Sequence, residues 1–195
     1  MSATSPIVFR HHWTAELYAL HLPFEAFDSF AHHPSFAEAW KRSMRPDHLL
    51  RIAGALVTEP GSDLHRRVAR AAGACARMVL DSAPPDDERP RLALRALDRW
   101  CDGNESREAL AIARRFTICS AMDCPSYAAS AVREALAVAA SNEKTTPAAL
   151  TADAASNAAS SALDARPFER HLFSLELAAI VRTMVPLPSL GARRS

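Results

Sequence analysis

The stretch PPDDERPRLALRALDRWCDGNES, residues 84–106, carries the signals of a helix start. Asp86 or Asp87 is placed to accept hydrogen bonds from the free N–H groups of the first helical turn, and Glu88 lies against the positive end of the helix dipole. Pro90 falls in the first turn, where its missing N–H would have had no partner. The acidic cluster is therefore interpreted first as a helix cap.

The residues that follow separate an apolar face from a charged one. Five apolar side chains recur at helical spacing and are predicted to be buried: Leu92, Ala93, Ala96, Leu97 and Trp100. Three arginines are predicted to form a solvated stripe: Arg91, Arg95 and Arg99. Gly103 then ends the helix. The stretch thus predicts one amphipathic helix.

The rest of the chain favours helices as well. Among its 195 residues are only five glycines, and no segment shows convincing alternation of β-branched residues. A hydrophobic content of 49% is sufficient for one buried core. We predict an all-α fold, a single-domain bundle or irregular solenoid of about eight to nine helices.

Apolar periodicity places further helices on both sides of this stretch. They are predicted near residues 36–40, 46–56, 61–82, 105–121, 125–140 and 168–185. The helix over 105–121 is expected to start after a cap at Asn104 and to bury one apolar stripe: Ala109, Ile112, Ala113 and Phe116. Residues 143–165 are either a low-complexity linker or a helix with a stripe of small residues, and we favour the helix.

The domain organisation follows from these elements. Residues 1–33 are predicted to be an aromatic-rich segment packed on the domain, residues 34–188 the all-helical domain, and residues 189–195 a frayed tail. The aromatic residues of the first forty positions are interpreted as core in preference to an interaction surface.

Charge and hydropathy exclude several classes of function. The formal net charge of +1 provides no electrostatic footprint for nucleic acid or for an acidic membrane surface. No uninterrupted apolar run reaches the ~20 residues of a membrane span, and the first residues lack the pattern of a secretory signal. We therefore expect a cytoplasmic protein without nucleic-acid or membrane partners.

Reactive residue types are present, but not in catalytic or metal-binding patterns. The pairs at 11–12 and 32–33 place adjacent histidines on different sides of a helix, and Cys119 and Cys124 lack a second cysteine pair. No serine or cysteine is set in a recognisable nucleophile motif, and no glycine-rich loop could hold phosphate. The prediction is a protein without enzymatic activity, cofactor or metal.

Three segments together resemble a known family: FAEAWKRSMRPDHLLRIAG (36–54), VARAAGACARMVLDSAPPDDERPRLALRALDRWCDG (68–103) and ALAVAASN (135–142). They are similar to the helical immunity proteins found beside bacterial polymorphic toxins. The matching positions are Trp40, Pro46, Asp47, Leu49, Leu50, the run 87–93, Trp100 and Gly103, and the resemblance covers residues 34–165.

The resemblance implies a cytosolic protein that binds a cognate toxin domain and blocks it by contact. Binding would need a complementary surface of ~800 Å² on each partner and no chemistry in this chain. On the loop positions at the two ends of the helix, the predicted partner-binding residues are Asp86, Asp87, Glu88, Asp102 and Glu105. The alternatives are a homo-oligomeric helical scaffold or regulatory module without a toxin partner, such as a homodimer, and, third, a helical protein with a ligand pocket or enzymatic site.

Overall fold

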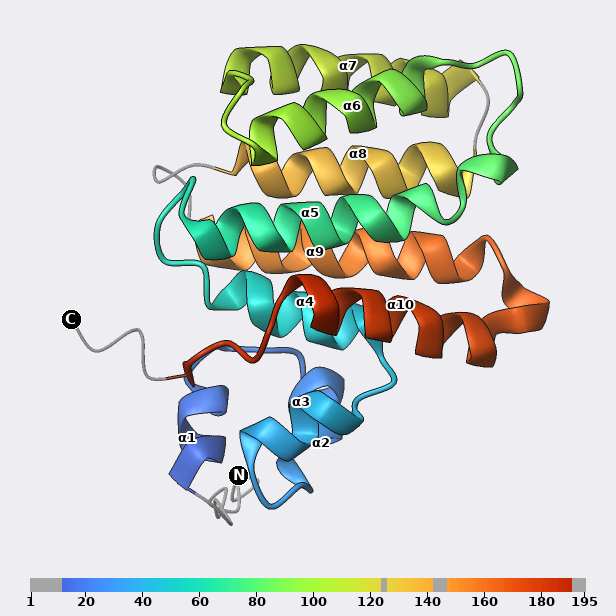
Figure 1. Cartoon of the computed structure of the whole chain (residues 1–195). Helices are drawn as coiled ribbons and strands as arrows, with labels where there is room; N and C mark the ends of the chain where they lie inside the picture. Colours follow the sequence, from blue (N-terminus) through green and yellow to red (C-terminus); the bar gives the residue numbers. More distant parts are fainter. Residues whose placement is uncertain (1–11, 124–125, 142–146, 191–195) are drawn as a thin grey trace, which may run out of the picture.

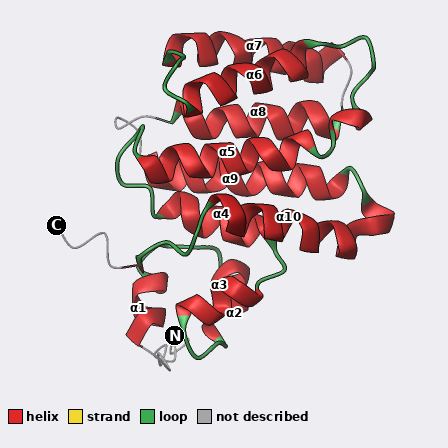
Figure 2. Cartoon of the chain, viewed as in Figure 1, coloured by secondary structure: helices red, strands yellow, loops and turns green. Residues whose placement is uncertain are grey.

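The computed structural model describes residues 12–123, 126–141 and 147–190, and every regular element in these ranges is helical. Figure 2 shows helices joined by loops, without a strand in this part of the chain. The all-α prediction is confirmed, with ten α-helices in the described ranges where eight or nine were predicted. They are α1 (His12–Tyr18), α2 (Phe24–Ala31), α3 (Phe36–Arg42), α4 (Pro46–Ala55), α5 (Asp63–Arg77), α6 (Arg89–Cys101), α7 (Arg107–Asp123), α8 (Tyr127–Ala140), α9 (Pro147–Asp164) and α10 (Arg170–Met184), with short 3₁₀ helices η1 (Leu80–Ser82) and η2 (Pro167–Glu169).

The two helices that periodicity missed are α1 and α2, in the aromatic N-terminal segment. They contain seven and eight residues, about two turns each, which is too short for an apolar period to be recognised. His21, with a φ of 54°, and Pro23, directly before α2, separate them. The helix count therefore differs because of these two short elements.

Helices α4 to α10 pack in two layers. One layer contains α6, α5 and α10, and the other contains α7, α8, α9 and α4, each in this order. In Figure 1 the layers run from the α6–α7 pair at the top to α4 and α10 below. Inner helices such as α5 and α8 have neighbours both within their own layer and in the other layer. The pair α6 and α7 is the end of the stack, and no described helix covers its outer side.

The backbones of α4 and α9 approach each other closely in the stack. The predicted helix over 143–165 is confirmed from Pro147 onward, while residues 143–146 lie outside the described residues. A Cβ added at Gly54 of α4 would lie 2.7 Å from the Cα of Ala152 in α9. The glycine and the small-residue stripe of α9 thus let the two backbones approach.

Helices α1 to α3, residues 12–42, form an N-terminal lobe against one side of the stack. Its centre is Phe36, whose ring lies 6.1 Å from that of Trp13, 6.2 Å from Phe30 and 5.9 Å from Trp40, measured between centroids. Phe30, Phe36 and Trp40 are buried. Trp13 and Phe27 are partly buried against the core, whereas Tyr18 and Phe24 are exposed, so the core interpretation holds only in part. The lobe extends past residue 33 to include α3.

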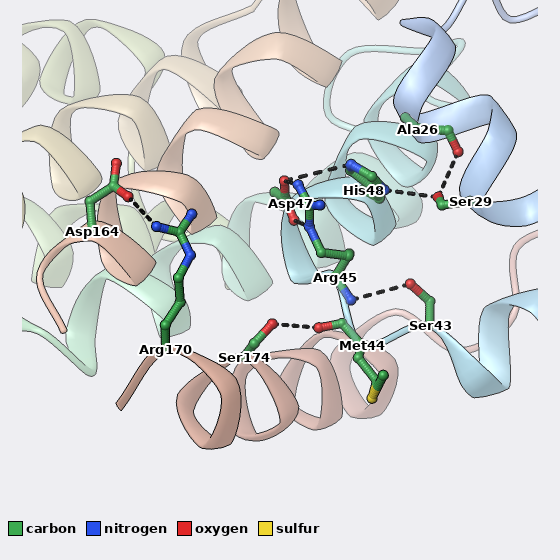
Figure 3. Close-up of polar contacts among 10 residues, drawn as sticks. All are labelled: Ala26, Ser29, Ser43, Met44, Arg45, Asp47, His48, Asp164, Arg170 and Ser174. Carbon is green, nitrogen blue, oxygen red and sulfur yellow. Dashed lines mark hydrogen bonds and ion pairs between the residues drawn. The ribbon is translucent and has the colours of Figure 1, made fainter. Parts of the chain in front are cut away.

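Polar contacts join this lobe to the stack (Figure 3). Ser29 of α2 lies 2.9 Å from Nδ1 of His48 in α4, measured from its hydroxyl oxygen. On the other side of the α3–α4 linker, the Ser174 hydroxyl of α10 donates to the carbonyl of Met44. The lobe is therefore bonded to α4, and the linker to α10. Beyond α10, Leu190 packs partly against the core, and residues 191–195 of the predicted frayed tail lie outside the described residues.

Candidate functional site

Asp87 caps the start of α6, and its side chain is buried. Its Oδ1 accepts from the backbone N–H of Arg89 at 3.1 Å and from Nε of the same residue at 2.8 Å. Its Oδ2 accepts from the Ser120 hydroxyl of α7. The hydrogen bonds from Arg89, with a smaller contribution from Ser120, lower the pKa of the Asp87 carboxyl to about 2. Asp87 is committed to contacts inside the protein, which removes it from the set available to a partner.

The other four predicted binding residues lie at opposite ends of α6. Asp86 and Glu88 are exposed before its first turn, and Asp102 and Glu105 follow its last turn. Three of them form ion pairs with arginines: Glu88 with Arg91, Asp102 with Arg70 and Glu105 with Arg99. A helix of 13 residues is about 20 Å long, so the structure does not bring the two acidic groups together.

The apolar stripes predicted to be buried on α6 and α7 are instead partly exposed. Leu92 is 54% exposed, Ile112 is 55% exposed and Phe116 is 56% exposed. The prediction that these three residues are buried is therefore wrong. The remaining predicted face of α6, including Leu97 and Trp100, is buried as expected.

The inward face of α7 is polar in its second half. Leu110 is fully buried, but the next buried side chains on the same face are Thr117 and Ser120. The Thr117 hydroxyl donates to the carbonyl of Arg114 at 2.8 Å, and that of Ser120 donates to Asp87. Because both hydroxyls are satisfied, their burial carries little penalty, and α7 can turn its apolar stripe outward.

The cap of α7 also differs from the prediction. The helix begins at Arg107, and the Ser106 hydroxyl accepts a hydrogen bond from the backbone N–H of Ala109 at 3.2 Å. Ser106 therefore occupies the capping position predicted for Asn104. The two-residue shift lengthens the loop from Gly103, whose φ of 80° suits a residue without a Cβ.

The two exposed stripes face each other and form a groove of about 500 Å³ between α6 and α7. Alanines of both helices line its base, and Leu92, Ile112 and Phe116 are its large exposed side chains. Arg89 and Glu105 lie at its two ends, next to the predicted acidic groups. The candidate functional site is this groove, which the predicted carboxylates flank without forming.

Arginines line the α6 side of the groove. Arg89 is bound to Asp87 through two guanidinium nitrogens, and Nε of Arg99 donates to Glu105 at 2.9 Å. Arg95 is exposed and makes no ion pair with any residue that the structure describes. The groove thus combines an apolar interior with guanidinium groups on one rim, which is formed by Arg89, Arg95 and Arg99 of α6.

One group of described residues resembles a hydrolase triad: Ser29, His48 and Asp47. Its geometry is unsuitable for catalysis. The Ser29 hydroxyl donates to the carbonyl of Ala26 at 2.9 Å, so its oxygen accepts from Nδ1–H of His48. The other ring nitrogen lies 3.8 Å from Oδ2 of Asp47, beyond hydrogen-bond distance. His48 therefore cannot take a proton from Ser29, and the contact holds the lobe on the stack (Figure 3).

Other reactive side chains do not converge either. Burial raises the pKa of the Cys75 thiol to about 12 and that of Cys101 to about 11, so neither supplies a thiolate near neutral pH. Among the described side chains, no group of three or more histidine, cysteine or acidic residues is placed to hold a metal ion. No helix of the described ranges is long and apolar enough to cross a membrane.

Sequence reasoning missed the groove residues as functional because it assigned them to the core. Leu92, Ile112 and Phe116 have the spacing of a buried stripe, and periodicity cannot tell which neighbour covers such a stripe. One signal was available. Thr117 and Ser120 stand seven and ten residues after Leu110, which gives α7 a second face of mixed polarity that competes for burial.

No protein-family model matches this chain, and neither a curated protein nor a solved structure is significantly similar to it.

Proposed function

We propose that the protein is a cytosolic immunity protein that binds a cognate bacterial toxin domain and neutralises it by direct contact. The observation that carries the proposal is the exposure of the α6 and α7 apolar stripes in one groove. Large apolar side chains gain free energy on burial, and a concave cluster of them is typical of a surface that a partner covers. The resemblance of residues 34–165 to immunity proteins supports a toxin as that partner.

The groove would be the centre of a larger interface. A standard interface buries ~800 Å² on each partner, more than one groove provides. Asp86, Glu88, Asp102 and Glu105 lie around the two ends of α6 and would supply polar contacts at its edge. The net charge of +1 argues against a strongly basic nuclease as the target.

The proposal is tested in a heterologous bacterial host. A toxin-like reading frame adjacent to the gene is expressed alone and together with this protein. We expect growth arrest in the first case, growth in the second, and a stable complex on purification. Continued arrest in the presence of folded protein would overturn the proposal. The absence of a toxic neighbour, combined with a salt-stable dimer by light scattering, would favour the homo-oligomeric alternative.

A further inference from the structure

We propose that the α6–α7 groove receives an amphipathic helix of the partner, with acidic residues along the side that faces α6. The inference rests on the proposed function for the identity of the partner, since a toxin domain would supply this helix. The structure supplies the arguments for its shape and its charge.

The shape of the groove favours a helix as the occupant. The groove runs from Arg89 to Arg99 along α6, a distance of about 15 Å at 1.5 Å per residue. On the opposite side, Ala109, Ile112 and Phe116 are spaced three and four residues apart, as on one ridge of a helix. An extended peptide would leave backbone N–H and C=O groups unsatisfied against these apolar walls, whereas a helix satisfies its own. A helix of about three turns fits the length.

The rim of the groove sets the charge of the occupant. Arg95 and Arg99 are four residues apart on α6, so their guanidinium groups are neighbours that repel each other. Arg95 has no ion-pair partner among the described residues, and Arg99 uses only its Nε for Glu105. Carboxylates of a ligand can accept from the remaining N–H groups and relieve the repulsion. An acidic flank on the helix therefore complements this rim.

The same charges disfavour a second copy of this chain as the occupant. Docking groove to groove would bring the arginines of two rims to one interface. Two carboxylates beside the groove, Asp87 and Glu105, are already bonded to Arg89 and Arg99. Like charges that face each other across an interface oppose association, so a partner with acidic residues is the better match.

The test uses the full chain and a displayed library of helical peptides of about 16 residues. Each peptide has apolar residues at i, i+4, i+7 and i+11, and flank positions drawn equally from Asp, Glu, Lys, Arg, Ser and Gln. The affinity of the selected peptides is measured for the unmodified protein, for a groove variant that carries L92Q and F116Q, and for a rim variant that carries R95E and R99E. Matched controls away from the groove are F168Q with L172Q, whose parent side chains are also exposed, and K41E with R42E at the end of α3.

We expect peptides with acidic flanks to be enriched and to lose affinity about tenfold or more for both variants, while the controls remain within about twofold. Exchange of the acidic flank for lysines should restore binding to the rim variant. Absence of enrichment, enrichment of basic or uncharged flanks, or equal binding to the groove variant would overturn the inference. Circular dichroism establishes that each variant is folded.

Rescue of toxin-expressing cells separates this inference from the proposed function. If the groove variant is folded and still rescues cells, the immunity function stands and the groove inference is overturned. If the unmodified protein fails to rescue while acidic peptides bind the groove, the groove inference stands and the toxin proposal fails.

Discussion

The carboxylate of Asp87, at the start of α6, accepts a hydrogen bond from the hydroxyl of Ser120 in the second half of α7. This contact, together with the burial of Leu110, fixes which side of α7 faces the stack. Because the polar groups satisfy each other in the interior, the apolar stripe with Ile112 and Phe116 is left facing the groove. A helix cap in one element thus determines the surface of the next.

Replacement of Asp87 by Asn should weaken this arrangement. The variant loses the negative charge that accepts hydrogen bonds from Arg89, and a buried hydrogen-bonding group left with poorer partners costs about 1–3 kcal/mol. The free energy of unfolding, measured by urea titration, should fall by this amount. D86N, at the exposed neighbouring position, is the control and should change the free energy by less than about 0.5 kcal/mol.

The pH dependence of the same contact has a defined sign. The pKa of Asp87 in the folded state is about 2, below the ~3.9 of an unfolded aspartate. Its contribution is therefore present above about pH 3.9 and is lost as the pH falls toward 2. The D87N variant should show a smaller loss of stability over that window. An equal loss in both proteins would show that Asp87 contributes nothing to acid sensitivity.

His65 should make the protein sensitive to milder acid. The ring is fully buried; Nδ1 accepts from the Gly61 N–H at 2.8 Å, and Nε2–H donates to the carbonyl of Val138 at 2.6 Å. Burial lowers the pKa of His65 below its ordinary 6.5, and protonation of Nδ1 would remove its acceptor. Since the unfolded chain then binds the proton more readily, stability should fall as the pH drops below about 6.5.

The H65Q variant tests this expectation by urea titration between about pH 7.5 and pH 5. Its stability should depend less on pH than that of the unmodified protein, because glutamine gains no proton in this range. Some dependence should remain, since burial also lowers the pKa of His48. H171Q, at an exposed position of α10, is the matched control for the replacement of a histidine by glutamine. A slope unchanged in H65Q would contradict the assignment.

The helical class and most long helices could be predicted because the local signals are strong. In α5 and α8 the apolar period identifies the buried face, and the structure places Val68, Cys75, Val132 and Leu136 in the core. The predicted end was less accurate for α5, which stops at Arg77 and not near residue 82. The small-residue stripe over 143–165 was likewise sufficient to favour the helix that became α9. These features depend on residues within one helix.

The groove could not be predicted because it depends on which helices lie at the end of the stack. The chain order gives no indication that α8 packs against α7 and α5, or that α9 packs against α8 and α4, which leaves α6 and α7 without an outer neighbour. The pairing of Asp87 with Ser120 spans 33 residues and selects the inward face of α7. Apolar spacing alone assigned Leu92 and Phe116 to the core because most such stripes are covered.

Replacement of Gly54 by Ala should disrupt the contact between α4 and α9. The added Cβ would lie 2.7 Å from the Cα and 2.8 Å from the backbone nitrogen of Ala152, so a helix must move. Overpacking of this kind costs about 1–3 kcal/mol. G73A is the matched control, because its Cβ meets the flexible end of Leu97, which can rotate away. In thermal unfolding, G54A should have the lower midpoint, and the opposite order would contradict the close approach.

The two faces of α7 should respond differently to truncation. Leu110 is fully buried, so L110A should lower the free energy of unfolding by about 2–5 kcal/mol through lost burial and a cavity. Ile112, two residues further along the same helix, is 55% exposed in the groove, and I112A should change stability by less than about 0.5 kcal/mol because alanine also favours the helix. Urea titration of both variants decides the matter. A large loss of stability in I112A would mean that its stripe is buried in solution and that the groove is closed. A small loss of stability in L110A would mean that α7 is rotated from the orientation that Asp87 and Ser120 define.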